Sequence, residues 1–141
     1  MIRPSIALVV VLLSASLLLG SCGGSGRLSK SAYRSRLALV SKQALAAHGA
    51  LDKMVGSAKT VVQVQEALRR FATAEDRLGN ELAGLKAPKD AESVNAKLAR
   101  RERDAAAEAR AAIPKLSKFE SLQQAFGFLQ GLVNGFTWRY N

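Results

Sequence analysis

Beyond residue 28 the apolar positions recur in steps of three and four residues, the spacing of one face of an α-helix. No stretch alternates apolar and polar residues with a period of two, so the pattern predicts no β-strands. Four apolar faces follow one another: Tyr33, Leu37, Val40, Ala44, Ala47, Leu51 and Met54; Val61, Val64, Leu68, Phe71, Leu78, Leu82 and Leu85; Val94, Leu98, Ala105, Ala109, Ala112 and Leu116; Phe119, Leu122, Phe126, Leu129, Val133 and Phe136.

Helix-end signals fall between these faces. Thr60-x-x-Gln63 matches a capping box ahead of the second face, and Ser117-x-x-Glu120 matches one ahead of the fourth. Asp90 suits the N-cap of the third helix. We therefore predict an all-α fold, an antiparallel bundle of four helices over residues 29–56, 60–86, 91–113 and 118–134.

Pro114 is expected to end the third helix, because proline cannot donate the next backbone hydrogen bond. In the alternative, a three-helix bundle, the third helix continues with a kink through Pro114. That helix would be far longer than its partners, and half of it would have nothing to pack against. We therefore prefer four helices.

Polar residues interrupt two of the faces and border a third. Glu75 interrupts the second face and Arg101 the third, so we expect these two to form a buried pair with a structural role. His48 borders the first face, and Leu45 stands where a Glu-x-x-His metal motif needs its carboxylate. We interpret His48 as an ordinary flanking residue, and we expect no metal site, no cofactor and no catalytic residue.

The first 26 residues follow another pattern. One arginine, Arg3, precedes the fourteen uncharged residues 6–19. A helix of that length, at about 1.5 Å per residue, falls short of the ~30 Å hydrocarbon core of a bilayer. A basic start, a short apolar run and small residues after it are typical of an export signal.

The end of this run, Leu19-Gly20-Ser21-Cys22, resembles the bacterial lipobox, the signal of bacterial lipoproteins. The resemblance implies that a diacylglyceryl group is attached to Cys22 and that the chain is cut just before it. Cys22 is also the only cysteine, so it forms no disulfide within the chain. We therefore expect a signal peptide over 1–21, a lipidated flexible tether over 22–28, the bundle over 29–136 and an aromatic tail over 137–141.

The chain is basic, with 21 Lys and Arg residues against 11 Asp and Glu and a net charge of +10. Such a charge favours anionic lipids or cell-wall polymers. Nucleic acid is not expected as a partner, because an exported protein does not meet it. The lipobox predicts an extracytoplasmic protein anchored to the cell membrane, or to the outer membrane in a Gram-negative source.

The expected role is that of a binding or structural module of the cell envelope, with a protein partner that the sequence does not identify. In composition the chain resembles the small Ala- and Arg-rich lipoproteins of actinobacteria. The alternative is an accessory or carrier protein that holds an apolar ligand between its Ala-lined helices. In the tail, Trp138, Arg139 and Tyr140 suit contact with a membrane surface, where aromatic rings and cations are favoured.

Overall fold

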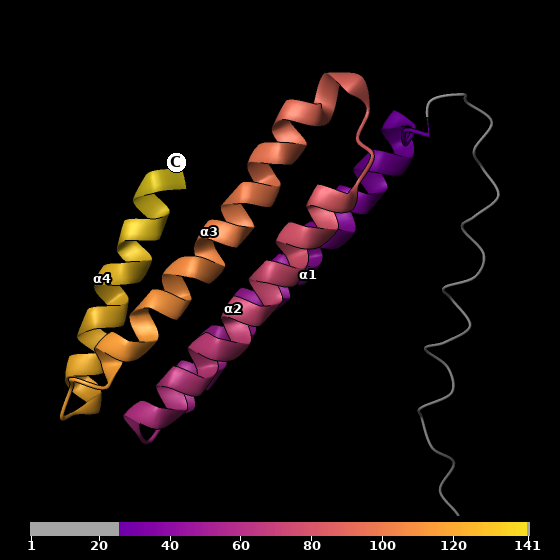
Figure 1. Cartoon of the computed structure of the whole chain (residues 1–141). Coiled ribbons are helices and arrows are strands. Elements are labelled where there is room, and N and C mark those ends of the chain that lie inside the picture. Colours follow the sequence, from indigo (N-terminus) through magenta and orange to yellow (C-terminus); the bar gives the residue numbers. More distant parts are fainter. Residues whose placement is uncertain (1–25, 141) are drawn as a thin grey trace, which may run out of the picture.

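The computed structural model describes residues 26–140, with side chains for residues 26–131 (Figure 1). No described residue lies in a strand. The chain is an all-α helical bundle, as predicted. Its elements are α1 (Lys30–Ser57), α2 (Val61–Gly84), a short 3-10 helix η2 (Lys89–Ala91), α3 (Glu92–Leu116) and α4 (Leu122–Tyr140).

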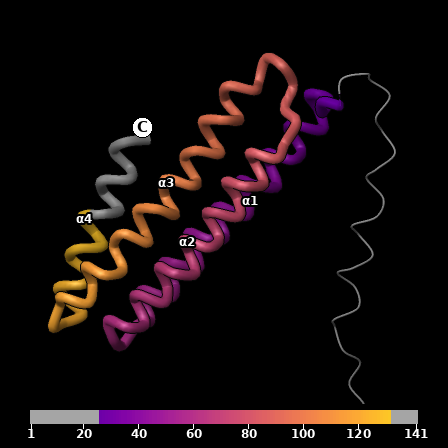
Figure 2. Tube along the Cα trace, in the orientation of Figure 1, coloured from indigo at the N-terminus to yellow at the C-terminus, as the bar shows by residue number. Residues whose placement is uncertain are grey.

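Helix α2 is the centre of the fold. Helices α1 and α3 both pack on it and run in the opposite direction, while α4 turns back after α3 and also contacts α2 (Figures 1 and 2). Burial agrees with this arrangement, because α2 has ten buried residues whereas α1 buries only Tyr33 and Val40. A helix with a broad apolar face can cover partners on two sides.

The core consists of two apolar clusters that lie one after the other along the bundle. Residues 26–29 lead into α1 at the end of the bundle that also holds the α2–α3 connection, and we call this end the entry end. The cluster nearer to it is formed by Val40, Leu78, Leu82 and Ala99. The larger cluster surrounds the opposite half and draws on all four helices; its most deeply buried members are Val64, Leu68, Ala72, Ala106, Ala109, Ala112, Leu116 and Ala125.

The predicted cap of α2 by Thr60 is confirmed, but the return bond of Gln63 goes to the N–H of Lys59, one residue before the cap. The Gln63 N–H donates to Thr60 Oγ1 at 3.2 Å, and Gln63 Oε1 accepts in return from the Lys59 N–H at 2.5 Å. The expected box at Ser117 was wrong. Helix α4 begins four residues later, where the Gln124 N–H donates to Ser121 Oγ at 3.3 Å.

The expectation that Pro114 ends α3 was wrong. The helix continues through it to Leu116, which is fully buried in the core. The burial of that leucine offsets the backbone hydrogen bond that proline forfeits. Gln65 also holds this turn, since its Nε2 donates to Ile113 O at 3.1 Å and to Ser117 Oγ at 2.8 Å. Helices α3 and α4 are nevertheless separate, as expected.

Asp90 is not the N-cap of α3. It lies in η2, and its carboxylate accepts from Lys30 Nζ at 2.6 Å, while no side chain caps α3. The predicted apolar face of α3 is also displaced by one residue at its start. Val94 is exposed and the next residue, Asn95, is buried instead. Likewise Leu98 is only half-buried, and the next residue, Ala99, is buried.

This displacement follows from specific contacts with the neighbouring helices. Tyr33 Oη donates to Asn95 Oδ1 at 3.2 Å, and Asn95 Nδ2 donates to Leu82 O at 2.7 Å. Ala99 faces Gly79, where a Cβ would lie 3.0 Å from the Ala99 carbonyl oxygen. Hydrogen bonding and the close approach of two backbones therefore set the rotation of α3.

Candidate functional site

A polar layer separates the two apolar clusters. Its centre is Glu75 on α2, whose side chain has no exposed area. Both carboxylate oxygens are buried and make no hydrogen bond within the described chain. The Nε2 of His48 on α1 lies 3.7 Å from Glu75 Oε1. The layer thus brings polar side chains of several helices to one level of the bundle.

Burial determines the charge of Glu75. The pKa of this carboxyl group is raised from 4.5 to about 9, and the largest cause is loss of hydration, since a charge is costly away from water. The nearby carboxyl group of Glu102 on α3 contributes to this same rise, because two neighbouring carboxylates repel each other. The positive charge of Arg101 acts in the opposite direction. Glu75 is therefore protonated and neutral at pH 7.

The expected buried pair of Glu75 and Arg101 was wrong in its details. Glu75 is buried as predicted, but Arg101 is exposed and acts on Glu75 through its charge. The next residue, Glu102, supplies the group that acts more strongly. Consecutive residues of a helix point about 100° apart, so a shift of one position exchanges a cation for an acid.

His48 borders the core, as expected, with a side chain that is 58% exposed. Its ring meets Phe71 edge to face, with centroids 5.0 Å apart. The 3.7 Å separation from Glu75 exceeds hydrogen-bond distance. A substrate could not approach the fully buried Glu75 without displacing core side chains. This geometry favours a structural polar layer over a catalytic site.

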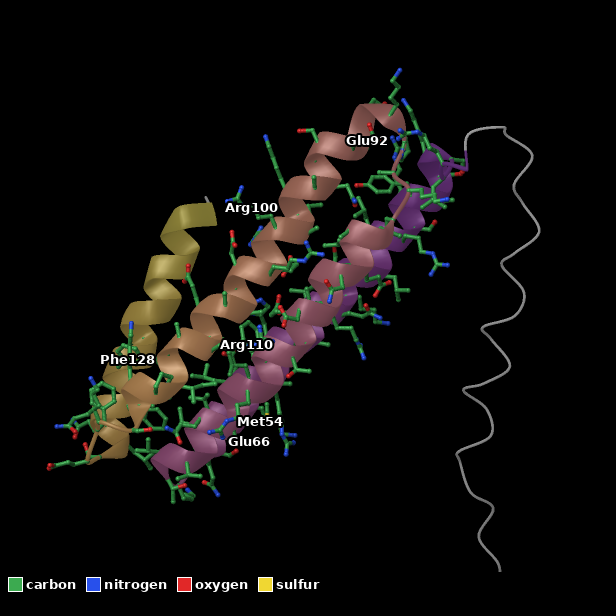
Figure 3. All side chains as sticks on the ribbon, in the orientation of Figure 1. Met54, Glu66, Glu92, Arg100, Arg110 and Phe128 are labelled. Carbon is green, nitrogen blue, oxygen red and sulfur yellow. The ribbon has the colours of Figure 1, made fainter. Side chains whose placement is uncertain are left out.

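At the entry end, residues that precede α1 are fixed to the α2–α3 connection. The Leu28 N–H donates to Lys86 O at 2.8 Å. Arg27 donates to Ala87 O at 3.0 Å and forms an ion pair with Glu92, which Figure 3 labels at the beginning of α3. Nothing in the sequence pattern predicted this clamp, because it joins segments sixty residues apart.

An open groove of about 480 Å³ lies beside this clamp. Arg27, Lys86 and Arg103 line it together with one acid, Glu92. The rest of the lining is largely alanine and Leu85. The groove does not include His48 or Glu75. The densest basic stretch of the sequence is residues 97–103 on α3, and its four cations, Lys97, Arg100, Arg101 and Arg103, are exposed.

Among the described residues, two ion pairs join side chains four residues apart on a helix surface. Arg70 and Glu66 lie 2.9 Å apart, and Arg100 and Asp104 lie 3.8 Å apart. Longer-range pairs were not predicted. Arg110 on α3 pairs with Asp76 on α2, and Figure 3 shows Arg110 on the side of α3 toward α2.

The other predicted site residues stay predictions. The lipobox residues Leu19, Gly20, Ser21 and Cys22 lie outside the described residues. Helix α4 extends over residues 135–140, beyond the expected end at 134, and so includes most of the predicted tail. The side chains of the tail residues proposed to contact the membrane, Trp138, Arg139 and Tyr140, are outside the described part.

Residues 26–131 contain no group of three or more His, Cys, Asp or Glu side chains arranged to hold a metal ion. Within the described chain, no helix combines the length and apolarity needed to cross a membrane. No protein-family model matches this chain, and neither curated proteins nor solved structures yielded a similar one. The class that the fold defines is therefore an all-α helical bundle with a polar layer and a basic groove.

Proposed function

We propose that this protein is a lipid-anchored, extracytoplasmic helical bundle that serves as a binding or structural module of the cell envelope. The lipobox at residues 19–22 motivates the anchor. The observation that carries the proposal is the clamp, in which Arg27 and Leu28 bind the α2–α3 connection. A lipid on Cys22 would hold the entry end near the membrane.

The charges at the entry end support this orientation. Lys86 and Lys89 belong to the α2–α3 connection, and neither forms an ion pair within the part of the chain that the structure describes. Cations close to a membrane surface are attracted to anionic lipids by about 1 kcal/mol each. A bundle that presents this end to the bilayer would gain that attraction in addition to the anchor.

Neither the carrier alternative nor an enzymatic role gains support. Glu75 lies between the two apolar clusters, so an apolar ligand running along the core would have to displace a buried carboxyl group. His48, the only histidine of the sequence, is beyond hydrogen-bond distance of Glu75. We therefore assign no reaction to this chain.

The test of the anchor is the variant Cys22→Ala, expressed as the full chain in bacteria. We expect it to leave the membrane fraction or to accumulate as unprocessed precursor, because the thiol that accepts the lipid is gone. Ser25→Ala, which lies outside the lipobox, is the matched control and should fractionate normally. A Cys22→Ala protein that is cleaved and still found in membranes would refute the proposal.

A further inference from the structure

Three basic side chains from three separate segments converge on the groove at the entry end. Arg27 precedes α1, Lys86 belongs to the α2–α3 connection and Arg103 lies on α3. The clamp fixes the first of these segments against the second. The groove is therefore assembled by the fold, and no single helix forms it.

The positive charge of the groove is only partly neutralised. Glu92 is the one acid in the lining, and it pairs with Arg27. Arg103 donates at 3.0 Å to Asn80 Oδ1, a neutral amide oxygen. Lys86 forms no ion pair with any residue that the structure describes. Two cations thus remain available to an anion.

Beside these cations the groove has an apolar wall. Leu85, Ala96 and Ala99 contribute to it, and its volume of about 480 Å³ lies within the range of small-molecule sites. A purely ionic ligand would leave this wall unused. A ligand with an anionic head and an apolar body would contact both the cations and the apolar wall. Each Lys or Arg near a phosphate head adds a charge-assisted hydrogen bond.

We propose that the groove binds the phosphate headgroup of an anionic phospholipid of the anchoring membrane. This inference rests on the proposed anchor, because the distance to the bilayer follows from it. Four peptide steps separate Cys22 from Gly26, which reach at most about 14 Å when extended. The Nζ of Lys86 is close to Gly26, 3.5 Å from where a Cβ would lie. Tethering therefore keeps the groove within reach of the headgroups.

The experiment uses the whole protein purified in a neutral detergent, so that vesicle attachment does not enter the result. Short-chain phosphatidylglycerol, short-chain phosphatidylcholine and inorganic phosphate are the three probes. The rate of acylation of Lys86 by an amine reagent is followed by peptide mass spectrometry. We expect phosphatidylglycerol alone to protect Lys86, while the exposed Lys53 at the opposite end of the bundle stays reactive.

Arg103→Gln removes a groove charge and keeps most of the side-chain stem that packs near Gly79. It should raise the half-protecting concentration of phosphatidylglycerol about five-fold, the effect of one cation near an anionic lipid. Arg100→Gln is the matched control, because Arg100 lies three residues earlier on α3 and does not line the groove. Figure 3 shows Arg100 on the side of α3 away from α2.

An unprotected Lys86 would overturn the inference, as would equal protection of Lys53. If inorganic phosphate protected Lys86 as strongly as phosphatidylglycerol does, the groove would be a site for free phosphate and the lipid proposal would be wrong. Equal effects of the two arginine variants would show diffuse charge attraction. The peptide containing Cys22 is read in the same digest. An unmodified Cys22 contradicts the anchor, whereas a lipidated Cys22 with an unprotected Lys86 contradicts only the groove.

Discussion

His48 Nε2 lies 3.7 Å from Glu75 Oε1, at the level where the core changes from one apolar cluster to the other. The two residues differ sharply in exposure, since the histidine is mostly solvated and the glutamate is fully buried. The imidazole therefore stands at the edge of a buried carboxyl group that carries no charge at neutral pH. Such a group makes the stability of the bundle depend on pH.

Glu75→Gln should flatten this pH dependence. The pKa of Glu75 is about 9 in the folded protein against an ordinary value of 4.5. At a pH between these two values, the folded protein holds a proton on Glu75 that the unfolded chain releases. The stability due to the protonated group is complete below pH 4.5 and is lost as the pH rises toward 9. Over this range the free energy of unfolding falls by at most about 1.4 kcal/mol per pH unit.

The measurement is urea unfolding of the wild type and of Glu75→Gln at several pH values between 4.5 and 9. The amide is neutral throughout, so the variant should become the more stable protein as the pH rises. Glu81→Gln, on the same helix, should keep the wild-type slope. Parallel curves for wild type and Glu75→Gln would show that Glu75 is not protonated in the folded bundle.

Gly79→Ala should destabilise the bundle. A Cβ there would lie 2.7 Å from Arg103 Cγ and 3.0 Å from the Ala99 carbonyl oxygen, so α2 and α3 would have to separate. Gly49 and Gly84 have nothing within 4 Å of the same position. Alanine at either of these helical sites should stabilise by about 0.5–1 kcal/mol, because glycine loses more backbone entropy on folding.

Thermal unfolding followed by circular dichroism compares the three glycine variants. The expected order places Gly79→Ala below the wild type and the other two above it. A Gly79→Ala protein as stable as Gly84→Ala would mean that the two backbones do not approach closely. The comparison controls for helix propensity, because all three sites exchange the same residues within helices.

Leu68→Ala should cost about 2–5 kcal/mol in the free energy of unfolding, because it opens a cavity in the larger cluster. Leu68 is only 2% exposed, whereas Leu45 on α1 is 75% exposed. Leu45→Ala, the matched control, should change stability by less than about 0.5 kcal/mol. Chemical denaturation distinguishes them, and equal effects of the two substitutions would contradict the assigned packing of α1 and α2.

Trp138 provides a test of membrane contact by the C-terminal residues. In the lipidated protein on anionic vesicles, its fluorescence should shift to the blue and resist aqueous quenchers, because indole prefers the headgroup region. Neutral vesicles serve as the control for the contribution of Arg139. Equal quenching with and without vesicles would exclude contact, and protection already present without vesicles would assign Trp138 to the bundle itself.

The sequence by itself determined the helical class, the order of the four helices and much of the core. Leu68, Phe71, Leu82 and Leu129 are buried where the periodicity predicted them. Helical spacing is a local property, and for α2 the apolar face, the cap at Thr60 and the observed start all agree. Leu37 and Leu51 on α1 and Phe126 on α4 are only half-buried, because these helices are covered on fewer sides than α2. Leu98 is half-buried because the buried face of α3 is displaced by one residue, to Asn95 and Ala99.

Only the tertiary structure decided how polar residues are shared between helices. Glu75 was recognisable as an interruption of an apolar face, but its partner depends on the rotation of α3, which Asn95 and Ala99 set through contacts with other helices. The clamp at Arg27 joins segments that are distant in sequence. Periodicity records which side of a helix is apolar; which neighbour meets that side, and at what height, follows from packing and hydrogen bonds between helices.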